Sequence, residues 1–318
     1  APTVKPLPKR NLRELPQSEC PKELLSQYYF DIDAAMHRGC VHACYLRKAH
    51  DIGAALDGLH DYISDVLQER KSTGVASAHE CHASRDFAHG ARTCLGNVDL
   101  MLDRPAGFLP ERLIGTDPSG ETSASRHPLI MVDEGACVQG GTLDCTAGDI
   151  WIGARAVVEP GALIRGPCII GQECTIRRGA YLRGDCLLGP ACVIGCEMKN
   201  ALTLDAVELP HHGYVGDSLL GHRAHFGCGT ITANFPLFPT SVPSVDIGAI
   251  RFDLGRRKFG AVVGDHSQVG CQSVLEPGCL LGKDTHAYPL SRLPRGTHGP
   301  NELIKTRPSV EGLYSKRH

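Results

Sequence analysis

Aliphatic side chains recur every six residues through the middle of the chain. The run is unbroken over eight positions, namely Ile152, Val158, Ile164, Ile170, Ile176, Leu182, Leu188 and Ile194. Glycine follows several of them directly, and the same phase returns between Val215 and Leu281. A period of six fits neither a helix face nor a strand, but it fits a solenoid whose six-residue units form the flat sides of a triangular coil. The pattern predicts an all-β solenoid, a left-handed parallel β-helix of hexapeptide repeats.

The sequence before and after the repeat has other patterns. Apolar residues at helical spacing over 52–67 predict one helix, and a shorter stripe over 24–35 predicts a partner helix. The expected organisation is an extended arm over 1–20, a helical hairpin and polar connector over 21–125, the β-helix over 130–294 with a loop insert over 235–258, and a tail over 295–318. Because an uncovered first coil would expose strand edges, we expect the hairpin to cover the solenoid's end, add subunit contacts or dock a partner.

Composition narrows the class of protein. The formal net charge is −2, with 33 Lys+Arg against 35 Asp+Glu, so the chain lacks the bulk charge of a nucleic-acid-binding protein. No apolar run is long enough to cross a membrane, and residues 1–10 lack the apolar segment of a signal peptide. The odd number of cysteines, 15, and the lack of a compact cysteine framework predict reduced thiols and a cytoplasmic protein.

Polar residues interrupt the hexapeptides between 197 and 234. The interruption includes Pro-His-His-Gly-Tyr-Val-Gly-Asp at 210–217 and Gly-Cys-Gly-Thr-Ile-Thr-Ala-Asn at 227–234. A histidine here is a candidate general base, since an imidazole changes its protonation near neutral pH. Arg183, Lys199 and Lys258 are candidate ligands of a phosphate.

The run His-x-x-Tyr-Val-Gly-Asp followed by Gly-x-Gly-Thr-Ile-Thr-x-Asn resembles a known family. It looks like the acetyltransferase half of the bifunctional bacterial N-acetylglucosamine-1-phosphate uridyltransferase/glucosamine-1-phosphate acetyltransferase, and it is similar to the archaeal sugar-1-phosphate enzymes. The resemblance covers residues 150–292. It implies an acetyl-CoA-dependent N-acetyltransferase of an amino-sugar phosphate, a hexosamine 1-phosphate, assembled as a homotrimer with its sites between subunits. Residues 1–130 lack a Gly-x-Gly-Thr-Arg-Met loop, so we expect no nucleotidyltransferase half.

The resemblance also implies a role for each matching residue. His211, three residues before Tyr214, matches the general base, and the backbone N–H of Cys228 matches the donor that stabilises the oxyanion. The region of Cys271 matches the part that holds acetyl-CoA. The matching substrate-binding positions are Arg183, Lys199, Tyr214, His225, Asn234 and Lys258.

Two departures from the family pattern concern the identity of the sugar. His225 stands where the family often has asparagine, and Gly184-Asp185 follows Arg183 in place of Pro-Gly. These departures motivate an alternative from another class, a non-catalytic solenoid that binds sugar phosphate and serves as a scaffold.

Metal-binding alternatives rest on histidine. His211, His222 and His225 could form a three-imidazole zinc site like that of β-helical carbonic anhydrases, although their intervals do not resemble that family. Two compact groups near the N-terminus could also bind a structural metal, namely His37, Cys40, His42 and Cys44, and His79, Cys81 and His82. Neither group has paired Cys-x-x-Cys spacing, so the favoured interpretation contains no metal.

Overall fold

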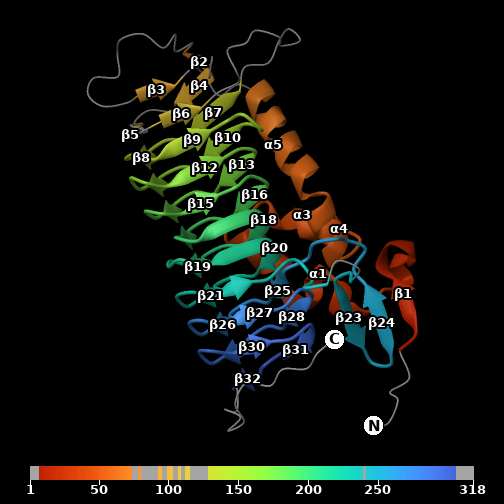
Figure 1. The fold of residues 1–318 in the computed structure, drawn as a ribbon. Helices are drawn as coiled ribbons and strands as arrows, with labels where there is room; N and C mark the ends of the chain where they lie inside the picture. The colour runs from red at the N-terminus through yellow and green to blue at the C-terminus, as the bar shows by residue number, and fades with distance from the viewer. Residues whose placement is uncertain are drawn as a thin grey trace.

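The chain forms a three-sided parallel β-solenoid with helices packed along one side (Figure 1). The computed structural model describes residues 7–73, 128–238 and 241–305, and the backbone of five short strands between 78 and 114. Where the repeat is regular, equivalent positions such as Ile150, Cys168 and Cys186 pair at intervals of 18 residues. Three hexapeptides therefore make one coil, and the prediction of a β-solenoid with a small N-terminal helical region is confirmed.

Each side of the solenoid is a ladder of short parallel strands. Face one, the side that carries the helices, consists of β7 (Leu129–Val132), β10 (Ile150–Ile152), β13 (Cys168–Ile170), β16 (Cys186–Leu188), β25 (Ala261–Val263), β28 (Cys279–Leu281) and β31 (Gly296–His298). Face two consists of β9 (Thr142–Asp144), β12 (Leu163–Arg165), β15 (Tyr181–Leu182), β22 (Ile231–Thr232), β27 (Val274–Leu275) and β30 (Arg292–Leu293). The longer strands β18 (Glu197–Thr203) and β20 (Tyr214–Leu220) begin on face two and end on face one.

Face three closes the triangle. It consists of β8 (Cys137–Val138), β11 (Val157–Val158), β14 (Thr175–Ile176), β17 (Val193–Ile194), β19 (Glu208–Leu209), β21 (His225–Phe226), β26 (Gln268–Val269), β29 (His286–Ala287) and β32 (Leu303–Ile304). The aliphatic residues of the period-six pattern point inward from all three faces and form one buried core. Stacking of like residues from coil to coil fills this core and sets the register of the ladders.

The ladders extend past the predicted limits of 130–294. On the N-terminal side, three strands continue the three ladders: β4 (Asp99–Leu102) pairs with β7, β5 (Gly107–Phe108) with β8, and β6 (Arg112–Ile114) with β9. Two more strands add to these: β3 (Arg92–Cys94) pairs with β6, and β2 (Ala78–His79) pairs with β4. On the C-terminal side, β31 and β32 pair with β28 and β29. Strand pairing therefore continues beyond residues 130–294 at both ends.

The helical region has more pieces than the predicted two-helix hairpin. It contains α1 (Ser26–Tyr29), α2 (Ile32–His37), α3 (Ala43–Lys48), α4 (Ile52–Asp57) and α5 (Leu59–Thr73), preceded by 3-10 turns at Leu12–Glu14, Gln17–Glu19 and Lys22–Leu24. Asp31 and Asp51 cap α2 and α4, because their carboxylates accept backbone N–H groups of the first turn. Gly39 has a φ of +89°, which favours glycine and ends the first helical stretch. No helix of the described residues is long and apolar enough to span a membrane.

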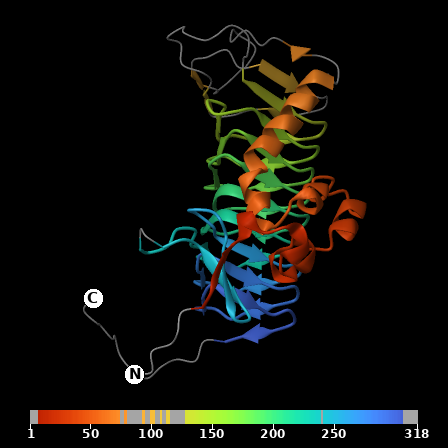
Figure 2. The ribbon, with the colours of Figure 1, turned by 90° about the vertical axis from the view of Figure 1, so that its right-hand side faces the viewer.

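These helices lie along face one rather than over an end of the solenoid (Figures 1 and 2). The reason is a second set of apolar residues on that face, which point outward from most of its strands. Apolar helical residues pack against this set and form a second buried core with it. Its outward members are Met131, Ile169, Leu187, Leu202, Leu219, Val262 and Leu280.

The insert between face two and face one is also tied to the N-terminal region. It forms a hairpin of β23 (Ser244–Ile247) and β24 (Ile250–Asp253), and β1 (Lys9–Asn11) pairs in parallel with β24. Residues expected to be an extended arm and a loop therefore join in one three-stranded sheet.

Because helices cover face one, we expect a substitution in the apolar core between the helices and this face to be destabilising. Leu187→Ala is expected to lower the free energy of unfolding by about 2–5 kcal/mol, because the side chain is fully buried and its loss leaves a cavity. Val274→Ala is the matched control, since Val274 is an outward, exposed residue of face two, and it should cost only about 0.5 kcal/mol. Urea titrations followed by circular dichroism compare the two, and equal losses would contradict the covered face.

A half-buried histidine is expected to give the helical region a pH dependence. Burial lowers the pKa of His42 from 6.5 to about 4, beside Tyr62 Oη at 2.9 Å from its Nδ1 and the ring of Trp151. Between pH 6.5 and 4 the unfolded chain binds a proton at this position that the folded chain does not, so stability falls as the pH falls. The loss should reach about 3 kcal/mol near pH 4. Unfolding titrations across this pH range should show that the His42→Gln variant loses less stability than the wild type. The His37→Gln variant should lose as much as the wild type, because His37 is exposed.

Candidate active site on face two

A buried carboxylate organises the edge between face two and face one. The Asp217 side chain is 7% exposed, and its two oxygens accept hydrogen bonds from Asn200 Nδ2 at 2.9 Å, Asn234 Nδ2 at 2.6 Å and Arg256 at 3.0 Å. Asn200 and Asp217 lie at equivalent corners of successive coils, each with a φ of +47°. Asn and Asp tolerate this left-handed conformation, so the same residues satisfy the turn and build the cluster.

The cluster positions Tyr214 on the outer surface of face two. Asn234 Nδ2 also donates to Tyr214 Oη at 3.0 Å. Burial, and after it the charge of Asp217, raises the pKa of the Tyr214 phenol, so the hydroxyl stays protonated at neutral pH and can donate a hydrogen bond. Gly216 lies beneath this contact, because a Cβ there would stand 2.3 Å from Tyr214 Oη and 2.7 Å from Asn234 Nδ2.

A cationic cavity of about 570 Å³ adjoins the cluster. Arg256 fixes one wall, because its guanidinium contacts both Asp217 and Asp57 and its Nε donates to the Lys258 carbonyl at 3.0 Å. Phe259 N–H donates to the Asn234 carbonyl at 2.9 Å, so the end of the insert is held beside Asn234. The lining residues are Arg13, Asp57, Asp217, Phe235, Gly255, Arg256, Arg257 and Lys258.

Asp57 and its two arginine partners, Arg13 and Arg256, were not predicted from the sequence. Arg13 and Asp57 come from the helical region, and Asp57 accepts hydrogen bonds from both Arg13 and Arg256. In the sequence, only the basic run Arg256-Arg257-Lys258 indicates this cavity. Arg13 and Asp57 reach it because the helical region packs on face one.

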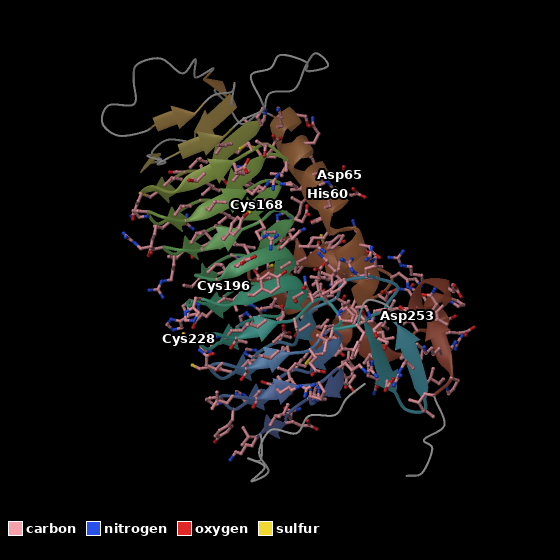
Figure 3. The ribbon with its side chains drawn as sticks, in the orientation of Figure 1. His60, Asp65, Cys168, Cys196, Cys228 and Asp253 are labelled. Carbon is pink, nitrogen blue, oxygen red and sulfur yellow. The ribbon has the colours of Figure 1, made fainter. Side chains whose placement is uncertain are left out.

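The opposite edge of face two, where it meets face three, carries the candidate base. His211 and His212 stand exposed in the turn after β19, and Cys228 occupies the equivalent turn of the next coil. Figure 3 shows Cys228 at the edge of the solenoid away from the helices. The Gly229 N–H donates to the His212 carbonyl at 2.8 Å, which fixes the two turns against each other. Cys271 follows at the same corner one coil further on, where Gln272 N–H donates to the Cys228 carbonyl at 2.8 Å.

The remaining predicted residues divide between two places. Lys199 pairs in register with Gly216, and Arg183 stands next to it in the preceding coil, where it forms an ion pair with Glu197 at 2.6 Å. His225 does not join Tyr214 and Asn234 within this chain. It lies on face three and lines a separate cavity of about 680 Å³ with Arg38, Asp205, Glu208, His222, Arg223, His266 and other residues.

The histidines of the zinc alternative do not come together: His222 and His225 line the same cavity, and His211 does not line it. His222 Nδ1 is 2.7 Å from Asp205 and its ring packs edge-on against His266, whereas His211 stands at the far edge of face three. Among the described residues, which include the group from His37 to Cys44, no three histidine, cysteine or acidic side chains are arranged to hold a metal ion. The group His79, Cys81 and His82 lies outside the described side chains.

The chain is similar to several known proteins over part of its length. No family model matches the chain. It is 34% identical over 93 residues to a bifunctional sugar-1-phosphate nucleotidylyltransferase/acetyltransferase of Sulfurisphaera tokodaii, covering 29% of this chain and 23% of that protein. It is 38% identical over 89 residues to the bifunctional protein GlmU of Methanococcus vannielii, covering 28% and 21%. The chain thus spans less than a quarter of the length of either relative.

A third relative is matched over most of its length. The chain is 35% identical over 173 residues to the uncharacterized acetyltransferase YaiX of Escherichia coli K12, which covers 52% of this chain and 74% of YaiX. On this similarity the chain belongs to the acetyltransferase family that includes YaiX.

Proposed function

We propose that the chain transfers an acetyl group from acetyl-CoA to the amine of an amino-sugar phosphate, a hexosamine 1-phosphate. The observation that carries this proposal is the Asp217 cluster beside a cationic cavity on face two. The names of the archaeal relatives, which include sugar-1-phosphate nucleotidylyltransferase/acetyltransferase, support the same class of substrate.

The cationic cavity suits the phosphate of the substrate. Lys258 and Arg257 are exposed at its rim, and Arg256 is held at its wall by two carboxylates. Arginine and lysine bind phosphate oxygens through charge-assisted hydrogen bonds. In this arrangement Tyr214 and Asn234 contact the sugar hydroxyls, and Lys199 with Arg183 extends the positive charge along face two.

The opposite edge suits the acetyl transfer. The amine nitrogen attacks the thioester carbonyl, His211 accepts the proton of the amine, and the thiolate of CoA departs. The Cys228 N–H is oriented by the turn between Gly227 and Gly229, and it stabilises the oxyanion of the tetrahedral intermediate. The turn that contains Cys271 contributes to the binding of acetyl-CoA.

We also propose a homotrimer. The helices occupy face one, so the free edge between faces two and three is the place where a neighbouring subunit can complete the site. His225 fits this arrangement, because it lies across that edge from Tyr214 and would reach the substrate of a neighbouring subunit. Light scattering on the full chain measures the mass of the assembly directly.

Release of CoA tests the proposed reaction. The chain is mixed with acetyl-CoA and either glucosamine 1-phosphate or galactosamine 1-phosphate, and free thiol is measured with a colorimetric reagent. Release that depends on the amino sugar, with an acetylated product identified by mass spectrometry, supports the proposal. A folded chain that binds sugar phosphate but releases no CoA would instead favour the scaffold alternative.

A further inference from the structure

The two arginines on either side of Asp57 differ in how many of their hydrogen-bond donors are used. All three guanidinium nitrogens of Arg256 donate inside the protein. Nη1 donates to Asp57 at 2.6 Å, Nη2 to Asp217 at 3.0 Å, and Nε to the Lys258 carbonyl at 3.0 Å. Arg13 uses only Nη2, which donates to Asp57 at 2.8 Å; among the residues that the structure describes, its Nε and Nη1 donate to no acceptor. Arg256 is therefore part of the wall of the cationic cavity, whereas Arg13 has donors left for a bound molecule.

The N-terminal segment holds Arg13 in place at this cavity. Strand β1, just before it, pairs in parallel with β24 of the insert (Figure 1), and the Leu12 side chain is buried. Asn11 Oδ1 accepts a hydrogen bond from the Arg13 N–H at 3.2 Å. The Arg13 side chain lies over Gly255, where a Cβ would stand 2.6 Å from both its Cγ and its Nε. Glycine at this position therefore leaves the room that the arginine side chain occupies.

The charge of the cavity matches a phosphate. Its lining contains four cationic side chains and two carboxylates, which leaves a net charge of +2. These are Arg13, Arg256, Arg257 and Lys258, against Asp57 and Asp217. A phosphate monoester carries a charge of about −1.5 to −2 at neutral pH. Without Arg13 the same lining would have a charge of only +1, so the arginine of the N-terminal segment is needed for this match.

We propose that Arg13 is a substrate-binding residue, which holds the phosphate of the amino-sugar phosphate. The proposal rests on the proposed function, in that the molecule bound in the cavity is a phosphate monoester. The free N–H groups of Arg13 donate charge-assisted hydrogen bonds to the phosphate oxygens, and Asp57 keeps the guanidinium at the cavity. The active site is then completed by a segment that lies outside the solenoid.

Binding measurements test the role of Arg13 without any turnover. Glucosamine 1-phosphate and inorganic phosphate are each titrated into the full chain in a calorimeter, and the wild type is compared with Arg13→Gln. The proposal expects the Kd for both compounds to rise by about 10-fold or more, the usual effect of losing hydrogen bonds to a charged group.

Arg10→Gln is the matched control. Arg10 is an exposed arginine of the same segment with one ion pair, to Glu19 at 2.6 Å, and it does not line the cavity. This variant should bind both compounds as the wild type does. A Kd for Arg13→Gln that equals the Kd for Arg10→Gln would overturn the proposal, and so would a wild-type chain that binds neither compound.

A second variant displaces Arg13 and keeps its charge. In Gly255→Ala the added Cβ collides with the Arg13 side chain, and the Gly255 φ of +69° adds backbone strain. Gly248→Ala adds similar strain in the same insert, at a φ of +59°, but its Cβ would have no neighbour within 4 Å. The proposal expects weaker binding of glucosamine 1-phosphate in Gly255→Ala and unchanged binding in Gly248→Ala. Equal binding by the two variants would contradict the role of Arg13.

The role of Arg13 and the proposed reaction can fail separately. Binding of glucosamine 1-phosphate that depends on Arg13, without release of CoA, would remove the proposed acetyl transfer and keep Arg13. If CoA is released, Arg13→Gln should raise KM for the amino-sugar phosphate and leave kcat almost unchanged, because the cavity lies at the edge of face two opposite His211. Release of CoA with an unchanged KM would keep the reaction and remove Arg13.

Discussion

His211→Ala is expected to lower amino-sugar-dependent release of CoA by about 100- to 10,000-fold, the usual contribution of a positioned general base. His211 stands exposed in the turn after β19, where no hydrogen bond to another described side chain holds its ring. Its loss therefore removes the proposed acceptor of the amine proton, and we expect the fold to be undisturbed. The comparison is made on kcat and KM at several pH values, since loss of a base lowers kcat most.

His286→Ala is the matched control, because His286 is also an exposed histidine on the solenoid, three coils further on. It should retain full activity. Thermal unfolding of both variants should be the same as that of the wild type. Equal rates for His211→Ala and His286→Ala would remove His211 from the proposed mechanism, and the base would have to lie elsewhere on face two.

Asp217→Ala is expected to affect stability and activity together. The Asp217 carboxylate and the Arg256 guanidinium are 7% and 10% exposed, and removal of Asp217 leaves the buried Arg256 with only one of its two carboxylate partners, Asp57. We expect a loss of about 3 kcal/mol in the free energy of unfolding. Asn200 and Asn234 lose their shared acceptor as well, so Tyr214 is no longer held and KM for the sugar phosphate should rise.

Two further variants sharpen this test. Asp217→Asn keeps the volume of the side chain but turns one oxygen into an amide that faces other donors, so it should resemble Asp217→Ala in KM. Asp246→Ala removes the carboxylate of a more exposed pair with Arg251 in the insert hairpin, and it should cost about 1 kcal/mol or less. Denaturant titrations give the free energies, and a loss in Asp217→Ala no larger than in Asp246→Ala would show that the cluster does not stabilise the fold.

The period of six predicted the coils because each coil repeats the same inward stack. A second signal was also in the sequence, in doublets such as Ile169-Ile170 and Leu187-Leu188, where the hexapeptide needs only one aliphatic residue. The extra residue of each doublet points outward and marks the face that the helices cover. The positions of the single and double aliphatic residues therefore indicate where the helical region packs, as well as the fold.

The site was predictable in part for the same reason. Val215 and Phe226 are inward residues on either side of a corner, so Tyr214 lies on face two and His225 on face three, as the phase of the repeat already implies. The contacts of Asp57 with Arg256 could not be predicted. They join positions 199 residues apart, and they depend on how the helices dock, which no local pattern in the sequence describes.

The helices along face one change how the solenoid is expected to unfold. In a plain repeat protein each coil contacts only its neighbours, so stability is a sum of local terms and the ends can fray independently. Here one apolar core connects Met131 near the first coils to Leu280 near the last, and β1 ties the insert hairpin to the same region. Loss of any one coil therefore exposes part of a surface that many coils share, which couples distant coils into a single cooperative transition.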